Sequence, residues 1–424
     1  MNFLFLHQNM PGQFKYLAPH LAAAGHQVVF ITRREGIEMP GIEKLLYKPA
    51  RDPHDNTHPY LRQYENSVLH GQQVVRVAQR LKQQGFLPDL VIAHPGWGES
   101  LFMKDLFPTA PLLGYGEFYY GTGGDVGFNP ADQISIDSLC RMRARNAHLL
   151  LSLEACDRAY SPTHWQRSRH PTALQSKIDV IFDGIDTALV KPDPAARFQL
   201  PGGRELTRGD PVVTYVARNL EPHRGFPEMV RAIPRLLERR PDADVVIVGG
   251  DEVSYGSAAP GGGSWREWMA KEVPLDPARV HFVGKLAYTR YLKLLQVSAV
   301  HVYLTYPFVL SWSFVEALAA GCAVVASRTP PVEEVIVEHY NGLLFDFFDT
   351  TQLAERVVDA LDNQQALEPL RRNARETVLD RYALDRCLPR QLELVWQLTG
   401  VNARNAARHN GVSRTERWSD MPPT

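Results

Sequence analysis

Short β-rich runs alternate with helical stretches along this chain, and the alternation limits the possible folds more than any other feature. The run "NFLFLH" is followed by a stretch predicted to be helical from about Gly12 to Ala24, and then by "HQVVFIT". The order continues through "PDLVIAH", which ends at His94, and "APLLGYGE", which ends at Glu117. Such alternation predicts a parallel sheet with helices on both faces.

The same alternation begins again in the second half of the chain. Gly, Pro and charged residues interrupt it around "FDGIDTALVKPDPAARFQLPGGRELTRGD", as expected of a linker with surface loops. Beyond this interruption come "PVVTYVA", "ADVVIVGG", "VHFVGKL", "AVHVYLT" and "AVVAS". A chain of 424 residues also exceeds the roughly 250 to 300 residues at which a single core stops growing. We therefore predict an α/β protein of two doubly wound, Rossmann-like domains that face a cleft.

The interruption predicts a domain boundary near residues 186–208. A final helix is predicted after the second domain, kinked or started afresh at Pro389, and the polar end of the chain is predicted to be disordered. In chain order, the predicted segments are an N-terminal domain, a linker, a C-terminal domain, the final helix and the disordered tail: residues 1–190, 191–208, 209–382, 383–402 and 403–424.

Composition excludes several classes of protein. Charged residues make up 22% of the chain and the formal net charge is -1, so there is no basic excess of the kind that nucleic acid requires. The N-terminus has no basic region before its short apolar run and reads as a first strand, not a signal peptide. No run approaches the roughly 18 apolar residues of a membrane-spanning helix. We expect a cytoplasmic protein whose only membrane contact is peripheral.

The four cysteines fit this compartment, because they lie far apart and form no CxxC pair, as expected of reduced thiols: Cys140, Cys156, Cys322 and Cys387.

Ligands of open α/β sheets bind outside the carboxyl ends of the strands, so residues just after strands are the informative ones. Arg218 follows "VVTYVA", and Arg224 comes six positions later, directly before the glycine that opens the next helix. Guanidinium groups at a strand end and a helix start make a clamp for a diphosphate. The alternative is that "RNLEPHR" is a solvated loop in which Glu221 pairs with an arginine.

Glu316 is the only carboxylate in the apolar segment "YPFVLSWSFVEALAAGC". In "SFVE" it completes a capping box in which Ser313 caps the helix and Glu316 bonds back to the cap. The same helix start follows a strand, where its positive end would attract phosphate and a carboxylate one turn later would hold a ribose diol. The residues alone leave both interpretations open.

The strand ends of the N-terminal half and one further turn carry weaker candidates. Gly12 lies in a strand-to-helix turn where backbone amides can approach a ligand, although every such fold needs sharp turns. His94 ends a strand, where a satisfied core or rim histidine is the ordinary alternative. Gly250, in "GGD", could approach the nucleotide or form a simple turn.

One basic helical stretch is a candidate for contact with a membrane surface. "CRMRARNAHLL" contains Arg141, Arg143 and Arg145, which face either acidic lipid or, more ordinarily, solvent.

Several chemistries lose support because their patterns are absent from the sequence. There is no His/Asp/Glu cluster with metal-ligand spacing, no GxSxG turn and no GxxxxGK[ST] loop. We accordingly predict neither a metal site nor a cofactor.

Together, these segments resemble the retaining glycosyltransferases of family 4, which have the GT-B fold. The resemblance covers residues 1 to about 400 and rests on "HQNMPGQF", "LAAAGHQVVFIT", "PDLVIAHPGW", "ARNLEPHRGF", "ADVVIVGGD", "VHFVGKL" and "FVEALAAGCAVVASRTPPVEEVIVEHYNGLLFDFFD". It implies that Arg218 and Arg224 hold the donor's diphosphate, the second replacing the usual Lys. Glu316 matches the second acid of the E-x7-E motif, which bonds the ribose hydroxyls. His94 matches a histidine beside the donor sugar, and Gly12 lies near the phosphates and acceptor.

The chain departs from the family pattern at one position. Eight residues before Glu316, where the family usually has its first acid and "GFGL", stand Phe308 and the segment "FVLSW". The donor sugar must therefore be held differently. Backbone amides of Val309, Leu310 and Ser311, with the Ser311 hydroxyl, are the groups predicted to bind phosphate or sugar there.

The resemblance implies a metal-independent hexosyltransferase. It would move a sugar, with retention, from a nucleoside diphosphate sugar to a saccharide or lipid-linked acceptor in cell-surface polysaccharide or glycoconjugate synthesis. Two alternatives remain open: a sugar-nucleotide epimerase or hydrolase of the same fold, and a non-catalytic partner subunit of a polysaccharide assembly complex that lost its chemistry at Phe308. A lipid-linked acceptor would bring peripheral contact with the inner face of the membrane.

Overall fold

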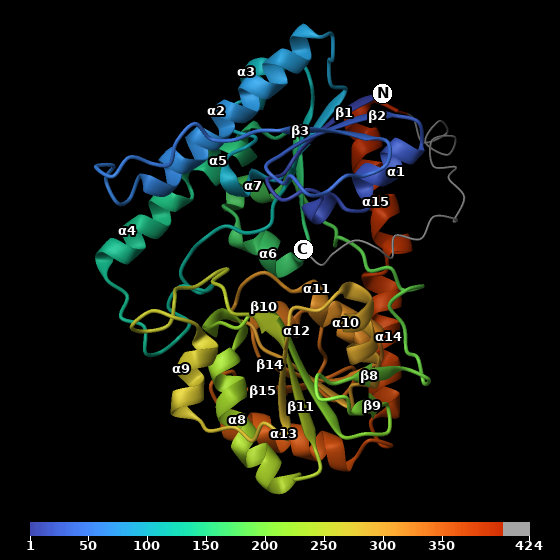
Figure 1. Ribbon diagram of the computed structural model, residues 1–424. Helices are drawn as coiled ribbons and strands as arrows, with labels where there is room; N and C mark the ends of the chain where they lie inside the picture. Colours follow the sequence, from blue (N-terminus) through green and yellow to red (C-terminus); the bar gives the residue numbers. More distant parts are fainter. Residues whose placement is uncertain (402–424) are drawn as a thin grey trace. The chain divides into compact units, whose positions relative to one another are not determined.

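The computed structural model describes residues 1–401, which form two compact units (Figure 1). Within the described residues, the N-terminal unit comprises Met1–Asp183 together with residues 387–401, and the C-terminal unit comprises Gly184–Arg386. The tail predicted over residues 403–424 lies outside the described residues. Each unit is built on its own parallel sheet with helices on both faces, which confirms the predicted fold class.

The sheet of the N-terminal unit has seven parallel strands in the order β3-β2-β1-β4-β5-β6-β7. Strand β1, an inner strand of this sheet, has the sequence "NFLFL", of which the last four residues are buried. A continuous apolar run of this kind is typical of a parallel strand covered on both faces. The strands are β1 (Asn2–Leu6), β2 (Gln27–Thr32), β3 (Ile42–Leu46), β4 (Leu90–Ala93), β5 (Leu112–Tyr115), β6 (Arg158–Ser161) and β7 (Ile178–Val180).

Apart from the one between β2 and β3, the connections of this sheet contain helices. The stretch predicted as one helix from Gly12 divides into a short 3₁₀ turn and α1. The long helical stretch of "DQISIDSLCRMRARNAHLLLSLEAC" also divides, at Asn146, whose side chain bonds both backbone groups of Tyr120. The elements are η1 (Gly12–Phe14), α1 (Leu17–Ala23), α2 (Arg62–Gln83), η2 (Pro95–Trp97), α3 (Met103–Leu106), α4 (Ile136–Arg145), α5 (Ala147–Ala155), α6 (His164–Arg169) and α7 (Thr172–Gln175).

The last described helix, α15 (Leu384–Thr399), begins at the end of the C-terminal unit and continues into the N-terminal one. Pro389 lies inside it, so the helix does not start afresh there. From Cys387 onward it packs on the N-terminal unit: the Trp396 ring lies 6.4 Å from Phe3, and Gln391 donates to the Phe182 carbonyl.

The C-terminal unit has a six-stranded parallel sheet in the order β12-β11-β10-β13-β14-β15 and a separate antiparallel hairpin, β8-β9. The hairpin lies within the segment predicted as a linker, residues 191–208, and belongs to this unit. The strands are β8 (Arg197–Gln199), β9 (Glu205–Thr207), β10 (Val212–Asn219), β11 (Asp244–Gly250), β12 (Val280–Gly284), β13 (Val300–Tyr303), β14 (Ala323–Ser327) and β15 (Leu343–Phe345).

Helices α8 and α13 pack side by side on one face of this sheet, and α11 packs with α14 on the other (Figure 1). Their amphipathic sequences turn an apolar stripe toward the strands. The elements are η3 (Pro222–Arg224), α8 (Phe226–Arg239), α9 (Trp265–Glu272), α10 (Tyr288–Val297), α11 (Trp312–Ala319), α12 (Pro330–Glu333), α13 (Thr350–Asp362) and α14 (Glu368–Arg381).

Both sheets contain a point at which the order of strands reverses. In the N-terminal unit it lies between β1 and β4, and in the C-terminal unit between β10 and β13. Ligands of doubly wound sheets bind outside the carboxyl ends of the strands at such points. The topology therefore selects two places for close inspection, one in each unit.

Two further features concern membrane-spanning helices and disulfide bonds. None of the helices within residues 1–401 is long and apolar enough to cross a membrane. All four cysteines are free thiols.

Candidate functional site

Arg218 lies at the carboxyl end of β10, beside the reversal point of the C-terminal sheet. Its side chain is exposed, and within residues 1–401 it makes no hydrogen bond, ion pair or ring contact. Exposed arginines are common, but this one lies at a strand end, where the ligands of doubly wound sheets bind. Here Glu221, three residues later, binds elsewhere, and Arg218 keeps all its donors for a ligand.

Arg224, in contrast, is buried and held by the unit itself. Its Nη1 donates to Thr305 Oγ1 at 2.7 Å and to the Val309 carbonyl at 3.0 Å, with the Tyr303 hydroxyl at 3.4 Å. All three contacts use the same nitrogen, and the Tyr255 ring lies beside the guanidinium. The guanidinium is thus fixed in direction, as a group that binds an anion must be.

A glycine makes this placement possible. Gly225 has φ +65°, and a Cβ there would meet the side chain of Leu304. Only glycine fits such a turn without strain. The turn closes η3 and starts α8, which keeps Arg224 at the end of β10.

Glu221 has a role that the sequence did not reveal. It is fully buried, and its Oε2 accepts backbone N–H groups of Ser254, Tyr255 and Gly256 at 3.1 to 3.3 Å. The interpretation in which it pairs with an arginine in a solvated loop is wrong. Its carboxylate instead fastens the loop after β11 over the turn that carries Arg224, and the Tyr255 ring lies 5.2 Å from the Arg224 guanidinium.

Glu316 lies in α11, where it is buried and accepts two hydroxyl groups. Tyr288 donates to Oε1 at 2.7 Å and Tyr291 to Oε2 at 2.8 Å. Burial, and beside it the Glu316 charge, raise the pKa of Tyr291 well above its ordinary value, so this hydroxyl keeps its proton. Each carboxylate oxygen can accept a second hydrogen bond. The two tyrosines therefore hold the carboxylate in one orientation, in which both of its oxygens can accept a further hydrogen bond.

The capping-box interpretation of Glu316 is wrong. The N-cap of α11 is Ser311, not Ser313, and no side chain caps it. The helix begins at Trp312, which places Glu316 beyond the position from which an acid can reach the cap, and the two tyrosines of α10 hold its oxygens instead.

The segment Val309 to Ser311 connects β13 to α11 and is partly occupied by internal bonds. The Val309 carbonyl accepts from Arg224, and the Ser311 N–H donates to the Tyr303 hydroxyl at 3.0 Å. The Ser311 hydroxyl shares a hydrogen bond with Ser313 at 2.7 Å. Thus the Ser311 amide, which was predicted to bind the donor, already donates a hydrogen bond within the unit. The Leu310 side chain is buried.

Phe308 belongs to a cluster of rings. It is 5% exposed, and its ring lies 5.1 Å from Tyr255 and 6.2 Å from His223, which stacks on Tyr306. An acid at this position would be buried against aromatic carbon at a high desolvation cost. The phenylalanine that replaces the family's first acid thus fits the aromatic side chains around it.

Gly250 ends β11 next to these elements. A Cβ on this residue would overlap the side chains of Glu252, Lys285 and Asn219. The close packing requires glycine whether or not a nucleotide approaches it. Among the residues predicted to bind the sugar donor, Arg224 and Val309 are in direct contact through a hydrogen bond. Glu316 instead contacts two tyrosines of α10.

The N-terminal unit places its predicted residues at the other reversal point. His94 directly follows β4 and His7 follows the neighbouring β1, and their rings lie 5.0 Å apart. Gly12 has φ +53°, and a Cβ there would overlap the His7 ring. His94 is only 2% exposed. Its Nε2 lies 3.3 Å from Oε2 of Glu117, an acid that our sequence reasoning did not select although it too follows a strand.

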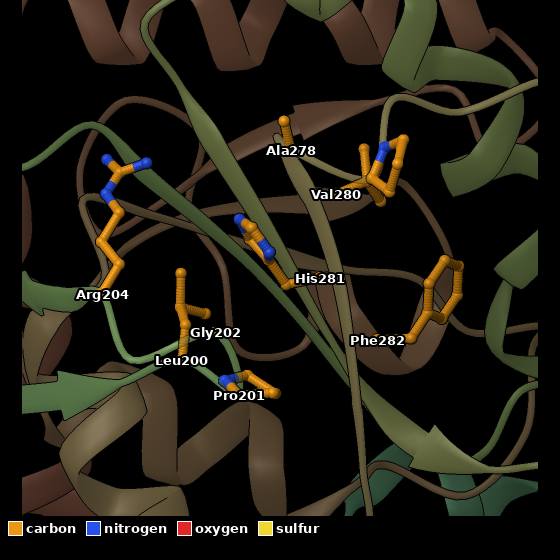
Figure 2. Close-up of a pocket in the computed structure, with 9 residues that line it drawn as sticks. Leu200, Pro201, Gly202, Arg204, Ala278, Val280, His281 and Phe282 are labelled. Atoms are coloured by element: carbon orange, nitrogen blue, oxygen red, sulfur yellow. The ribbon is translucent and has the colours of Figure 1, made fainter.

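A separate pocket of about 390 Å³ lies at the opposite edge of the C-terminal sheet (Figure 2). Arg204, His281 and Phe282 are among its lining residues, and nearby Asp244 opens β11. The buried Asp244 carboxylate accepts from Arg204 through both oxygens and lies 3.0 Å from His281 Nε2. These charges satisfy one another at the amino ends of the strands, so we do not place the ligand there.

Residues 1–401 contain no group of three or more His, Cys, Asp or Glu side chains placed to hold a metal ion.

Comparison with family models divides the chain as the two sheets do. Residues 24–190 match the model of the glycosyl transferase family 4 group, and residues 202–377 match that of glycosyl transferases group 1.

Individual proteins similar to this chain in sequence or fold include a glycogen synthase and two other proteins of known structure. The chain is 24% identical over 403 residues to a glycogen synthase of Mycobacterium tuberculosis, covering 85% of this chain and 84% of that one. Its fold is similar to that of sucrose-phosphate synthase from Thermosynechococcus elongatus, with a TM-score of 0.72, 19% identity and coverage of 95% and 100% of the two chains. HepE of Anabaena in complex with UDP-glucose follows, with a TM-score of 0.64, 16% identity and coverage of 94% and 100%.

Proposed function

The two family matches and the fold place this chain among the GT-B glycosyltransferases, and from that premise we propose that it transfers a sugar, with retention, from a nucleoside diphosphate sugar to an acceptor hydroxyl. The observation that carries the proposal is the pair of arginines after β10. Arg218 has no partner within residues 1–401, and Arg224 is aimed by three contacts on a single nitrogen. Guanidinium donors match the oxygens of a diphosphate, and Arg224 is already held in place for this contact.

Charge develops on the diphosphate as the bond to the sugar breaks. Donors that are already oriented stabilise this charge without reorganising, which is where electrostatic catalysis contributes most. Arg224 meets that requirement through its contacts to Thr305 and Val309, and the positive end of α11 follows the same loop. We propose that these groups supply the positive charge in place of a metal ion. A front-face substitution needs no protein nucleophile.

Glu316 is proposed to bind the ribose of the donor. Tyr288 and Tyr291 orient its two oxygens, and each oxygen retains acceptor capacity for a ribose hydroxyl. A ribose diol presents two neighbouring O–H donors, which suits a carboxylate with two oriented oxygens.

Substitution of Glu316 separates this role from a structural one. Glu316→Gln keeps the shape and one acceptor oxygen, and we expect it to weaken nucleoside diphosphate binding by roughly tenfold through the lost charge. Tyr288→Phe, which removes a supporting hydroxyl but not the carboxylate, should weaken binding less. Isothermal titration calorimetry gives both affinities. Unchanged affinity in Glu316→Gln, with a lower melting temperature, would assign the acid to the fold alone.

The reaction is tested with EDTA-treated protein and a panel of UDP, GDP, TDP and ADP sugars. We expect one donor to release its nucleoside diphosphate only when an acceptor is present, and NMR of the product to show the anomeric configuration of the donor retained. Release of free sugar or of an epimer from the donor alone would favour the epimerase or hydrolase instead. A requirement for added divalent metal would contradict the proposed role of the arginines.

A lipid-linked acceptor, as in cell-surface glycan synthesis, is favoured by α4. This helix has no buried residue, Ile136 is 72% exposed and the preceding Ile134 43%, and Arg141 and Arg143 are exposed on the same short helix. Apolar and basic side chains together suit the surface of an anionic membrane. We expect the protein to sediment with anionic vesicles at low salt, and Ile136→Glu to reduce this binding. Equal sedimentation with neutral vesicles, or none, would argue against it.

A further inference from the structure

Resting on the proposed function, we propose that Glu117 is a sugar-binding residue whose carboxylate accepts a hydrogen bond from a substrate hydroxyl. The site lies in the N-terminal unit, where Glu117 follows β5 by two residues and β5 pairs with β4, the strand that precedes His94. It therefore stands at the same carboxyl edge as the two histidines of the reversal point.

The Glu117 backbone is held from both sides. The N–H of the preceding Gly116 donates to the Tyr160 carbonyl at 2.7 Å, and the Glu117 carbonyl accepts from Gln166 Nε2 at 2.6 Å. Gln166 is fully buried near the start of α6, where Thr163 caps the helix. A side chain on a fixed backbone loses less entropy when it binds a ligand.

A directed series of hydrogen bonds leads to the carboxylate. His7 Nδ1 accepts the Asn9 N–H at 2.9 Å, so the proton of a neutral His7 is on Nε2, which lies 2.8 Å from Gln13 Oε1. Gln13 then donates from Nε2 to Glu117 Oε1 at 2.7 Å. Because every donor in this series points toward Glu117, the series ends in an acceptor.

His94 approaches the other oxygen of Glu117. Its Nδ1 accepts the Gly96 N–H at 3.0 Å, so the proton of a neutral His94 is on Nε2, at 3.3 Å from Glu117 Oε2. This buried N–H makes no hydrogen bond within residues 1–401, although the Glu117 carboxylate lies beside it. A buried donor without an acceptor is costly, and a sugar hydroxyl satisfies it because such a group accepts and donates at once.

Exposure identifies which member of the network meets the ligand. The side chain of Glu117 is 26% exposed, whereas that of His94 is 2% exposed. His94, predicted to lie beside the donor sugar, is thus a positioning residue, and Glu117 presents the charged surface to the substrate. The hydroxyl belongs either to the donor sugar or to the acceptor.

The test compares Glu117→Gln with Glu99→Gln in the full-length protein. Glu99 is a matched control because it is an acid of the same unit that is fully buried and accepts from Tyr47, so it cannot touch a ligand. We expect Glu117→Gln to lower kcat/KM by roughly 10- to 100-fold, as for a lost hydrogen bond to a charged group. Thermal stabilisation by the nucleoside diphosphate, which lacks the sugar that is transferred, should stay unchanged.

Kinetics distinguish the two sources of the hydroxyl. If the donor sugar supplies it, donor KM rises and slow donor hydrolysis without acceptor falls. If the acceptor supplies it, acceptor KM rises and that hydrolysis is unchanged. Activity of Glu117→Gln within about twofold of the wild type, or an equal loss in Glu99→Gln, would overturn the inference while nucleotide binding still supports the transferase. Failure of every nucleoside diphosphate to stabilise the wild type would overturn the proposed function and this contact with it.

Discussion

Arg218→Ala is expected to lower kcat/KM for the sugar nucleotide by roughly 10²- to 10³-fold, the loss typical when one donor to a developing charge is removed. The melting temperature should stay close to that of the wild type, because the Arg218 side chain is exposed and has no partner within residues 1–401. Steady-state kinetics and a thermal melt of the same preparation measure both quantities. Few residues of this chain allow function to be separated from stability so cleanly.

A second arginine provides the control. Arg239 ends α8 and is also exposed and without a partner in the described part of the chain, but α8 leads away from the carboxyl ends of the strands. Arg239→Ala removes the same charge from the same unit and should leave kcat/KM unchanged. Normal turnover in Arg218→Ala, or an equal loss in both variants, would rule out a specific contact between Arg218 and the diphosphate.

Arg224→Ala is expected to have the larger effect, a loss of at least about 10³-fold in kcat/KM together with a lower free energy of unfolding. The alanine removes the donor to Thr305 Oγ1 and to the Val309 carbonyl. Leaving such buried acceptors unpaired costs about 1 to 3 kcal/mol, which urea unfolding detects. Arg224→Lys, the residue usual in the family that the chain resembles, restores the charge and should recover part of the activity.

Thr305→Val isolates the supporting contact. It takes one acceptor from Arg224 but leaves the guanidinium in place, so we expect a loss in kcat/KM of no more than about tenfold. If Arg224→Ala lost stability but retained turnover, Arg224 would only fasten the loop between β13 and α11. A loss in Thr305→Val as large as that in Arg224→Ala would point to the same conclusion.

Much of this architecture was predictable because parallel strands leave strong patterns in a sequence. Strands buried on both faces read as apolar runs, and their alternation with helices predicted both sheets. The rule that ligands lie after strands then selected Arg218, Arg224 and His94 without knowledge of the fold's details. The same rule applied to Glu117, which follows β5, would have found the acid beside His94 as well.

Contacts between elements distant in the sequence were not predictable. "SFVE" has the spacing of a capping box, but the helix starts at Trp312 and the tyrosines of α10 hold Glu316. The partners of Glu221 are backbone N–H groups of a loop more than thirty residues later. Spacing reports only local partners, whereas a buried carboxylate takes whichever donors the tertiary fold brings to it.

The aromatic cluster at Phe308 bears on what the donor sugar meets. Tyr255 contacts the Phe308 ring and also lies beside the Arg224 guanidinium. Its backbone N–H is held by Glu221, so the aromatic cluster and the turn that carries Arg224 pack against the same loop. We expect the sugar to be held at this position by shape and by backbone groups, since no carboxylate replaces the family's first acid there. Donor preference is therefore a property to measure and not to transfer from relatives.

The measurement that tests the central claim most directly is calorimetric titration of nucleoside diphosphates, without added metal, into the wild type, Arg218→Ala and Arg239→Ala. If the carboxyl edge of the C-terminal sheet binds the donor, one diphosphate should bind the wild type and Arg239→Ala equally and Arg218→Ala at least about tenfold more weakly. If no diphosphate binds, or if Arg218→Ala binds as well as the wild type, the account is contradicted. A chain that binds no diphosphate would be better described as a non-catalytic partner subunit.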